Sequence, residues 1–161
     1  MFIEGEILIT IFTTPSCSSC RKAKKWLNEY KVPYQEKNLM VTKITDKDIN
    51  LMLKNADNGF DDIISKRSKA FIENNLNVDE MTVKELKDFI IEHPSVLKRP
   101  IIVDDDKMQV GYNDDDIRVF VPKRLREIIM CSECSQNADC DYQLALAKYL
   151  NEIRSDLQDK A

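Results

Sequence analysis

The first forty residues combine continuous apolar runs with one stretch of helical periodicity. Residues 7–12, ILITIF, are β-branched, aromatic and aliphatic, which predicts a buried strand. Across residues 18–30 the apolar side chains recur at the spacing of one helix face, with lysine and arginine opposite: Ala23, Trp26, Leu27 and Tyr30. Pro33 cannot continue that helix, and residues 33–39 favour a second strand. These elements predict a right-handed βαβ unit with parallel strands.

The pattern changes over residues 42–93, where no segment has the signature of a strand. Three helices are expected there, at residues 45–55, 63–72 and 82–92. Threonine begins the first and the last, and in the last Thr82 and Glu85 have the spacing of a capping box. The turn-like sequence NADNGFDD contains Gly59, which can adopt a positive φ. We interpret this segment as a helical insertion.

Strand character returns in the segment RPIIVDDDKMQVGY. Ile101–Val103 and Met108–Val110 predict two short strands, joined by a hairpin through DDDK. Asn113 is then expected to begin a helix, whose acidic first turn suits the helix dipole. A further helix is expected beyond Asp141. In chain order these elements predict an α/β fold, namely a thioredoxin-like mixed four-stranded sheet with a helical insertion.

Chain length and composition bound the organisation of the molecule. The 161 residues favour one compact domain with an insertion. Of the whole chain, 43% of the residues are hydrophobic and 32% are charged. We expect a thioredoxin-like redox domain from residues 1–41 and 97–130, the helical insertion from 42–96, and a cysteine-bearing tail with a helix from 131–161. The formal net charge of −4 argues against DNA binding by charge alone. No apolar run is long enough to span a membrane, and an acidic start is unlike a secretory signal, so a cytoplasmic protein is expected.

Two cysteines three residues apart, Cys17 and Cys20, lie between the first predicted strand and the first helix. The start of a helix favours an anion such as a Cys17 thiolate, and Cys20 one turn later is within disulfide reach. This context is typical of a redox pair, either catalytic or sensing. Metal ligation and two unreactive thiols are the alternatives, and the residues alone do not separate catalysis from sensing.

A second cysteine cluster has the spacing C-x-x-C-x5-C and consists of Cys131, Cys134 and Cys140. A zinc site needs four ligands, and the only histidine, His93, is far away in sequence. A second disulfide or redox pair, a zinc site and ordinary thiols all remain open for this cluster. No metal site and no cofactor is predicted from the sequence.

Three segments resemble a known family: IFTTPSCSSCRKAKKWL, NGFDDIISKRSKAF and IIEHPSVLKRPIIVDDDKMQVGYNDDDIRVF. From about residue 7 to residue 127 the chain resembles the Spx family of transcriptional regulators, in the arsenate-reductase-like branch of thioredoxin folds. The N-terminal extension and the tail after residue 130 are not covered by the resemblance.

The resemblance implies a function. Spx-like proteins bind the C-terminal domain of the RNA polymerase α subunit and redirect transcription during thiol-oxidative stress, reaching promoter DNA only as part of the polymerase complex. Their CxxC redox switch corresponds here to Cys17 and Cys20, and their glycine at the polymerase contact to Gly59. The arginine tied to the redox site corresponds to Arg99, before a proline that thioredoxin folds hold in the cis form. ClpXP proteolysis, directed in part by the C-terminal segment, keeps such proteins scarce.

The rival class is an enzyme, an arsenate reductase that uses Cys17 as its nucleophile. Those enzymes often have histidine and asparagine before the loop proline, where this chain has Thr13 and Thr14. They have an arginine after the second hairpin strand, where this chain has Tyr112 or Asn113. They also commonly lack the second cysteine of the pair. A glutaredoxin-like reductase would keep the pair but has no use for the insertion, so we predict a regulator and not an enzyme.

Overall fold

The computed structural model of the chain describes residues 9–123, 125–126, 147–152 and 154. Its centre is a mixed four-stranded sheet with the strand order β2-β1-β3-β4. The strands are β1 Ile9–Thr13, β2 Tyr34–Asn38, β3 Ile101–Val103 and β4 Met108–Val110. β1 is parallel to β2 and antiparallel to β3, and β4 is antiparallel to β3. The predicted βαβ unit, the hairpin and the thioredoxin-like α/β class are confirmed.

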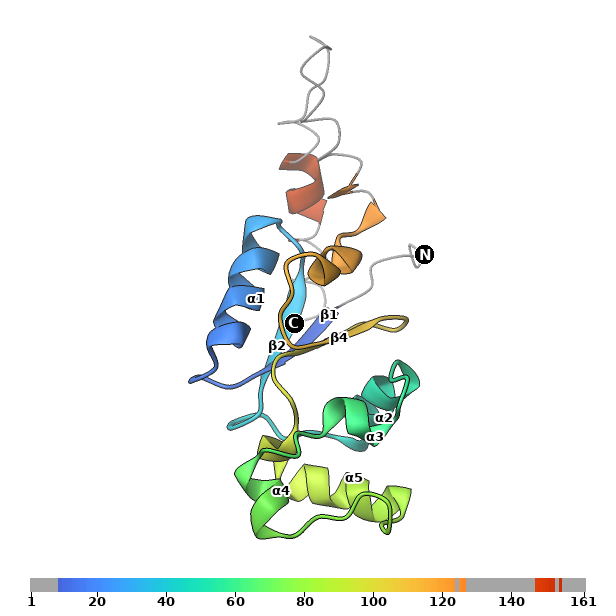
Figure 1. Cartoon of the computed structure of the whole chain (residues 1–161). Coiled ribbons are helices and arrows are strands. Elements are labelled where there is room, and N and C mark those ends of the chain that lie inside the picture. Colours follow the sequence, from blue (N-terminus) through green and yellow to red (C-terminus); the bar gives the residue numbers. More distant parts are fainter. Residues whose placement is uncertain (1–8, 124, 127–146, 153, 155–161) are drawn as a thin grey trace.

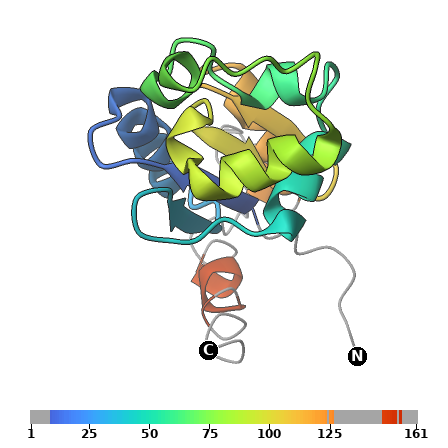
Figure 2. The same ribbon diagram turned by 90° about the horizontal axis from the view of Figure 1, so that it is seen from below.

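Helices cover both faces of this sheet. They are α1 Ser18–Glu29, α2 Asp46–Lys54, α3 Phe60–Ile63, α4 Lys69–Glu73 and α5 Val83–Glu92, with the 3-10 helices η1 Pro94–Val96 and η2 Asp116–Phe120. Figure 1 shows α2 to α5 grouped on one side of the strands and α1 on the other. Seen from below, α5 lies in front of the strands (Figure 2). No helix in these ranges has the length and apolar character of a membrane span.

The two faces of the sheet bury two hydrophobic cores, because successive residues of a strand point to opposite sides. On β1, Phe12 packs in the core formed with the insertion, whereas Ile11 packs in the core formed with α1. On β3, Ile101 belongs to the first core and Ile102 to the second. The helical insertion therefore shares a core with the sheet.

Capping boxes begin the two longest insertion helices, as the sequence predicts for α5. At α2, Thr45 accepts a hydrogen bond from the Asp48 backbone and Asp48 accepts one from the Thr45 backbone. Asp48 also accepts a hydrogen bond from Lys37 on β2, with a distance of 2.6 Å between Nζ and Oδ1. Asp48 is 8% exposed, so this ion pair joins the sheet to the insertion in a largely buried place.

We expect Asp48→Asn to lower the free energy of unfolding by about 2 kcal/mol at neutral pH, because the carboxylate accepts charge-assisted hydrogen bonds. Burial alone would raise the pKa of Asp48, but hydrogen bonds from Lys37 and Thr45 outweigh it and hold that pKa below its ordinary value. The stabilisation is therefore complete above the unfolded pKa of about 4 and is lost as pH falls through the lower folded pKa. Urea unfolding of both proteins from pH 7 to pH 3 checks this, and a difference that stays constant over that range would contradict it.

The single helix predicted at residues 63–72 is two short helices, α3 and α4, and the prediction is wrong for residues 64–68. Ile64 is extended and forms an antiparallel bridge with Leu97, and the chain re-enters a helix only at α4, after Ser68 caps it. Ile64 and Leu97 are both fully buried. Pairing with a distant segment in the core has overridden the local helical pattern.

The helix predicted from Asn113 begins later and is a 3-10 helix, η2. The Asn113 side chain accepts hydrogen bonds from the backbone of Asp115 and Asp116, which forms a turn before the helix. Of the predicted tail helix, residues 147–152 and 154 are helical, and the others lie outside the described residues. The cluster of Cys131, Cys134 and Cys140 also lies outside them. The three-part division of the chain stays a prediction.

Candidate functional site

The predicted cysteine pair lies at the start of α1, where Cys17 is the N-cap residue. The Cys17 sulfur accepts a hydrogen bond from the Cys20 backbone N–H at 3.2 Å, which satisfies one of the unpaired donors of the helix start. Both thiols are free; Cys17 is half-buried and Cys20 is 1% exposed. An incoming oxidant therefore meets Cys17 first, and Cys20 is the covered partner.

The electrostatics of Cys20 agree with this order. Burial, followed by the hydrogen bond with the Cys17 thiol, raises the pKa of Cys20 to about 12, although the Thr14 backbone and Arg99 act in the opposite direction. A thiol with so high a pKa is protonated at neutral pH and is a poor nucleophile. Chemistry at this pair therefore starts at Cys17.

Cys17 lines a pocket of about 880 Å³ whose walls are basic. Its cationic lining residues are Lys66, Arg67, Lys98 and Arg99, and Asp61 is the one carboxylate lining it in the described part of the chain. Arg99 Nη1 donates a hydrogen bond to Thr14 Oγ1 at 3.2 Å, which holds the guanidinium beside the cysteine loop. The Arg99–Pro100 peptide bond is cis, as expected. Such a pocket suits a thiolate or an oxyanion.

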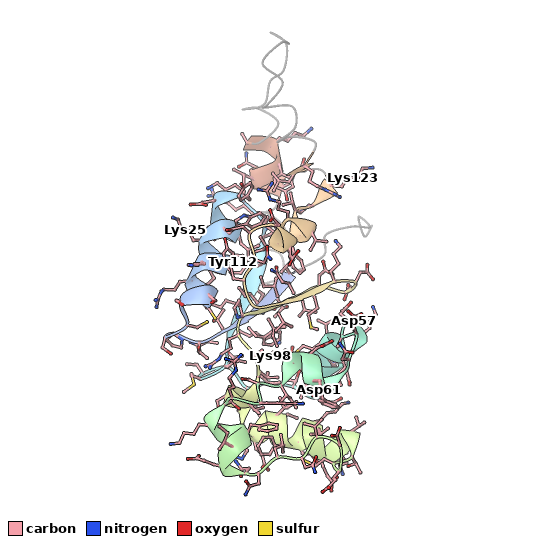
Figure 3. All side chains as sticks on the ribbon, viewed as in Figure 1. Lys25, Asp57, Asp61, Lys98, Tyr112 and Lys123 are labelled. Carbon is pink, nitrogen blue, oxygen red and sulfur yellow. The ribbon has the colours of Figure 1, made fainter. Side chains whose placement is uncertain are left out.

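The pocket also joins the cysteine loop to the insertion. The Ser65 backbone donates to the Val96 carbonyl, and the Lys98 backbone to the Ile63 carbonyl, both at 2.8 Å. Lys98 Nζ donates to the carbonyl of Asp61 in α3 at 2.8 Å, and Figure 3 shows these two residues near each other. The end of α3 is thus paired with the segment that leads directly into Arg99.

Gly59 lies at the other end of α3 and is its N-cap residue, so it does not terminate the preceding helix. Its backbone has φ 62° and ψ −128°, a conformation that is strained for every residue except glycine. An added Cβ would meet no atom within 4 Å. A side chain at this position would strain the backbone and would extend into open space.

Comparisons with known proteins assign the family. The ArsC family profile matches residues 12–120. A "Global transcriptional regulator Spx" of Streptococcus pneumoniae is 48% identical over 120 residues, covering 74% of this chain and 90% of that protein. The Bacillus subtilis protein of that name is 44% identical over 119 residues, covering 74% and 91%. The chain belongs to the Spx branch of the ArsC family.

Solved structures show how widely the fold of this Spx-family chain is shared. A putative ArsC family related protein from Bacteroides fragilis has a TM-score of 0.61 at 21% identity, covering 70% of this chain and 96% of that one. A possible arsenate reductase from Streptococcus mutans has a TM-score of 0.59 at 20% identity, covering 70% and 98%. These identities establish the fold alone, and the same fold carries regulators and enzymes. By family, the chain is a global transcriptional regulator.

The structure brings some predicted site residues of the Spx-family chain together and separates others. Cys17, Cys20 and Arg99 meet at the cysteine loop, whereas Gly59 does not line the pocket. Sequence reasoning missed Thr14, which binds Arg99 across 85 positions of the chain. Two signals marked it: its place beside the CxxC motif, and its departure from the residues that arsenate reductases often have before the loop proline. Within the ranges described, no group of three or more His, Cys, Asp or Glu side chains is placed to hold a metal ion.

Proposed function

We propose that this chain is a redox-sensitive transcriptional regulator that contacts the C-terminal domain of the RNA polymerase α subunit through the surface around Gly59. The switch is a disulfide between Cys17 and Cys20. The observation that carries the proposal is the continuous connection from the cysteine loop through Arg99 and the Ile64–Leu97 bridge to α3. A change at the cysteines is thereby passed to α3, the short helix that Gly59 caps at its other end.

The switch works through local electrostatics. In the reduced form, the Cys17 sulfur occupies the basic pocket and accepts the Cys20 N–H. A disulfide changes the group that Cys17 presents to Arg99 and Lys98 in this pocket, and we expect both side chains to rearrange. Lys98 also binds the Asp61 carbonyl in α3, so its rearrangement alters the surface offered to the polymerase.

We expect Gly59→Arg to abolish binding to the purified C-terminal domain of the polymerase α subunit, because a long side chain would extend from the contact surface. Gly59→Ala is the matched control, since it imposes the same backbone strain without the length, and it should retain most of the binding. A pull-down of the wild type and both variants, with and without oxidant, checks this. No binding by the wild type in either redox state would contradict the proposal, and equal binding by Gly59→Arg would move the contact elsewhere.

The other partners follow from the same proposal. The net charge of −4 leaves few surplus cations for phosphates, so the protein reaches promoter DNA only together with the polymerase. ClpXP is proposed as the protease that removes it. Recognition by ClpXP depends on the C-terminal segment, most of which lies outside the described residues.

A second candidate function is thiol-dependent arsenate reduction. The basic pocket beside Cys17 favours it, because four cationic side chains line a space that an oxyanion could occupy. Purified protein incubated with arsenate, a glutathione-type thiol and a reductase couple tests it. Turnover that Cys17→Ser abolishes would establish the enzyme, and the absence of turnover would leave the regulator alone.

A further inference from the structure

A second, smaller hollow of about 440 Å³ reaches the buried member of the cysteine pair. Its lining includes Cys20, Lys24 and Glu36, and it shares only Thr14 with the basic pocket beside Cys17. The two thiols of the pair therefore face different solvent-connected spaces. The regulator function assigns no role to the second space.

A fixed hydrogen-bond network forms one wall of this hollow. Thr13 Oγ1 donates to Glu36 Oε1 at 2.5 Å, and Lys24 Nζ donates to the same oxygen at 2.9 Å. Lys24 follows Cys20 by four residues on α1, so both side chains lie on one face of the helix. Glu36 on β2 thus holds the ammonium group on the side of α1 that carries Cys20.

Hydrogen bonds favour the charged forms of both Lys24 and Glu36. The hydrogen bond to Glu36 raises the pKa of Lys24, so Lys24 is cationic at neutral pH. Burial opposes ionisation of Glu36, but hydrogen bonds from Thr13 and Lys24 outweigh it and lower its pKa. Three other titratable or charged side chains act on Cys20 or line this hollow: Cys17 and Arg99 act on Cys20, and Arg21 lines the hollow.

Disulfide closure requires Cys20 to act as a nucleophile. With a hydroperoxide as oxidant, the Cys17 thiolate attacks the terminal peroxide oxygen, the O–O bond breaks, and Cys17 becomes a sulfenic acid. The alkoxide or hydroxide that leaves takes a proton from water and becomes an alcohol or water. Cys20 then loses its proton to water in the hollow, and its thiolate attacks the Cys17 sulfur. The S–S bond forms, the S–O bond breaks, and the hydroxide takes up a proton to leave as water.

We propose that Lys24, positioned by Glu36 and Thr13, stabilises the Cys20 thiolate during this closure. The inference rests on the proposed redox switch and adds the residue that makes its second step possible. An opposite charge nearby favours the ionised form of a thiol, and the Lys24 side chain is 32% exposed, so water screens part of its effect. Part of the gain is offset, because a less basic thiolate is also less nucleophilic, which leaves about a threefold effect on the closure rate.

Rapid-quench kinetics with hydroperoxide test this role. The sulfenic acid at Cys17 is trapped with dimedone, and the disulfide is followed by mass spectrometry, so that oxidation and closure are measured separately. Lys24→Met should slow closure about threefold and leave the oxidation of Cys17 unchanged, and Lys24→Arg should restore the wild-type rate. Lys25→Met is the matched control, because Lys25 pairs with Glu29 and lies on the outer side of α1 (Figure 3).

Each outcome bears on one proposal. If the wild type forms the disulfide and Lys24→Met forms it at the same rate, this inference is wrong and the redox switch stands. Slowing of both steps alike, or failure of Lys24→Arg to restore closure, also overturns it, because a charge effect on Cys20 predicts neither. A wild type that forms no Cys17–Cys20 disulfide removes the proposed switch itself.

Discussion

Cys20→Ser is expected to eliminate the oxidant response while leaving Cys17 open to oxidation. Cys17 is the accessible thiol and Cys20 the buried one, so the first oxidation step does not need Cys20. Without a resolving thiol, Cys17 remains a sulfenic acid or is oxidised further. The response of polymerase binding to hydroperoxide should then disappear.

The peptide that a trypsin digest releases from residues 1–21 reports this directly. It contains Cys17 and Cys20, no other cysteine, and no lysine or arginine before Arg21. After oxidation the wild-type peptide should lose two hydrogens, and the Cys20→Ser peptide should instead carry a dimedone adduct at Cys17. Ser19→Ala on the same helical turn is the control and should behave as the wild type. An oxidant response that survives in Cys20→Ser would assign the switch to other cysteines.

The second large effect concerns the core that joins the insertion to the sheet. Phe12 is fully buried there, and we expect Phe12→Ala to lower the free energy of unfolding by about 3–5 kcal/mol, through lost burial and a residual cavity. Residues of β1, β3, α2 and α5 share this core, so sheet and insertion should unfold in one transition. Urea unfolding followed by circular dichroism and by tryptophan fluorescence checks both statements.

Val41→Ala is the matched control for the core substitution. Val41 is 83% exposed, and its truncation should change the free energy of unfolding by less than about 0.5 kcal/mol. Two separate unfolding transitions in the wild type would contradict a shared core. So would a Phe12→Ala variant whose free energy of unfolding falls by less than about 1 kcal/mol, which is small for such a core truncation.

Local sequence signals predicted those parts of the fold that depend on local chemistry. The βαβ unit followed from two apolar runs around a helical stripe, and the start of α5 followed from Thr82 and Glu85. The hairpin of β3 and β4 followed from two short apolar runs separated by DDDK. In each case the residues that decide the structure lie within a few positions of one another.

The errors and omissions involve residues that are distant in sequence. Ile64 looked helical because its partner Leu97 cannot be read from neighbouring residues. The pairing of Arg99 with Thr14 and that of Lys24 with Glu36 depend on the packing of strands and helices that sequence periodicity does not specify. The CxxC motif therefore predicted the candidate site, while the groups that surround each thiol required the three-dimensional structure.

The most direct test of the coupling between the switch and the polymerase contact is the reduction potential of the Cys17–Cys20 pair. This potential is measured with and without a saturating amount of the C-terminal domain of the polymerase α subunit. By linkage, a disulfide that changes the affinity for the polymerase domain requires that domain to shift the potential by the same factor. A coupling of about tenfold corresponds to a shift of about 30 mV for a two-electron couple, and we expect at least that much. A bound polymerase domain that leaves the potential unchanged would show that the cysteine pair and the contact surface act independently.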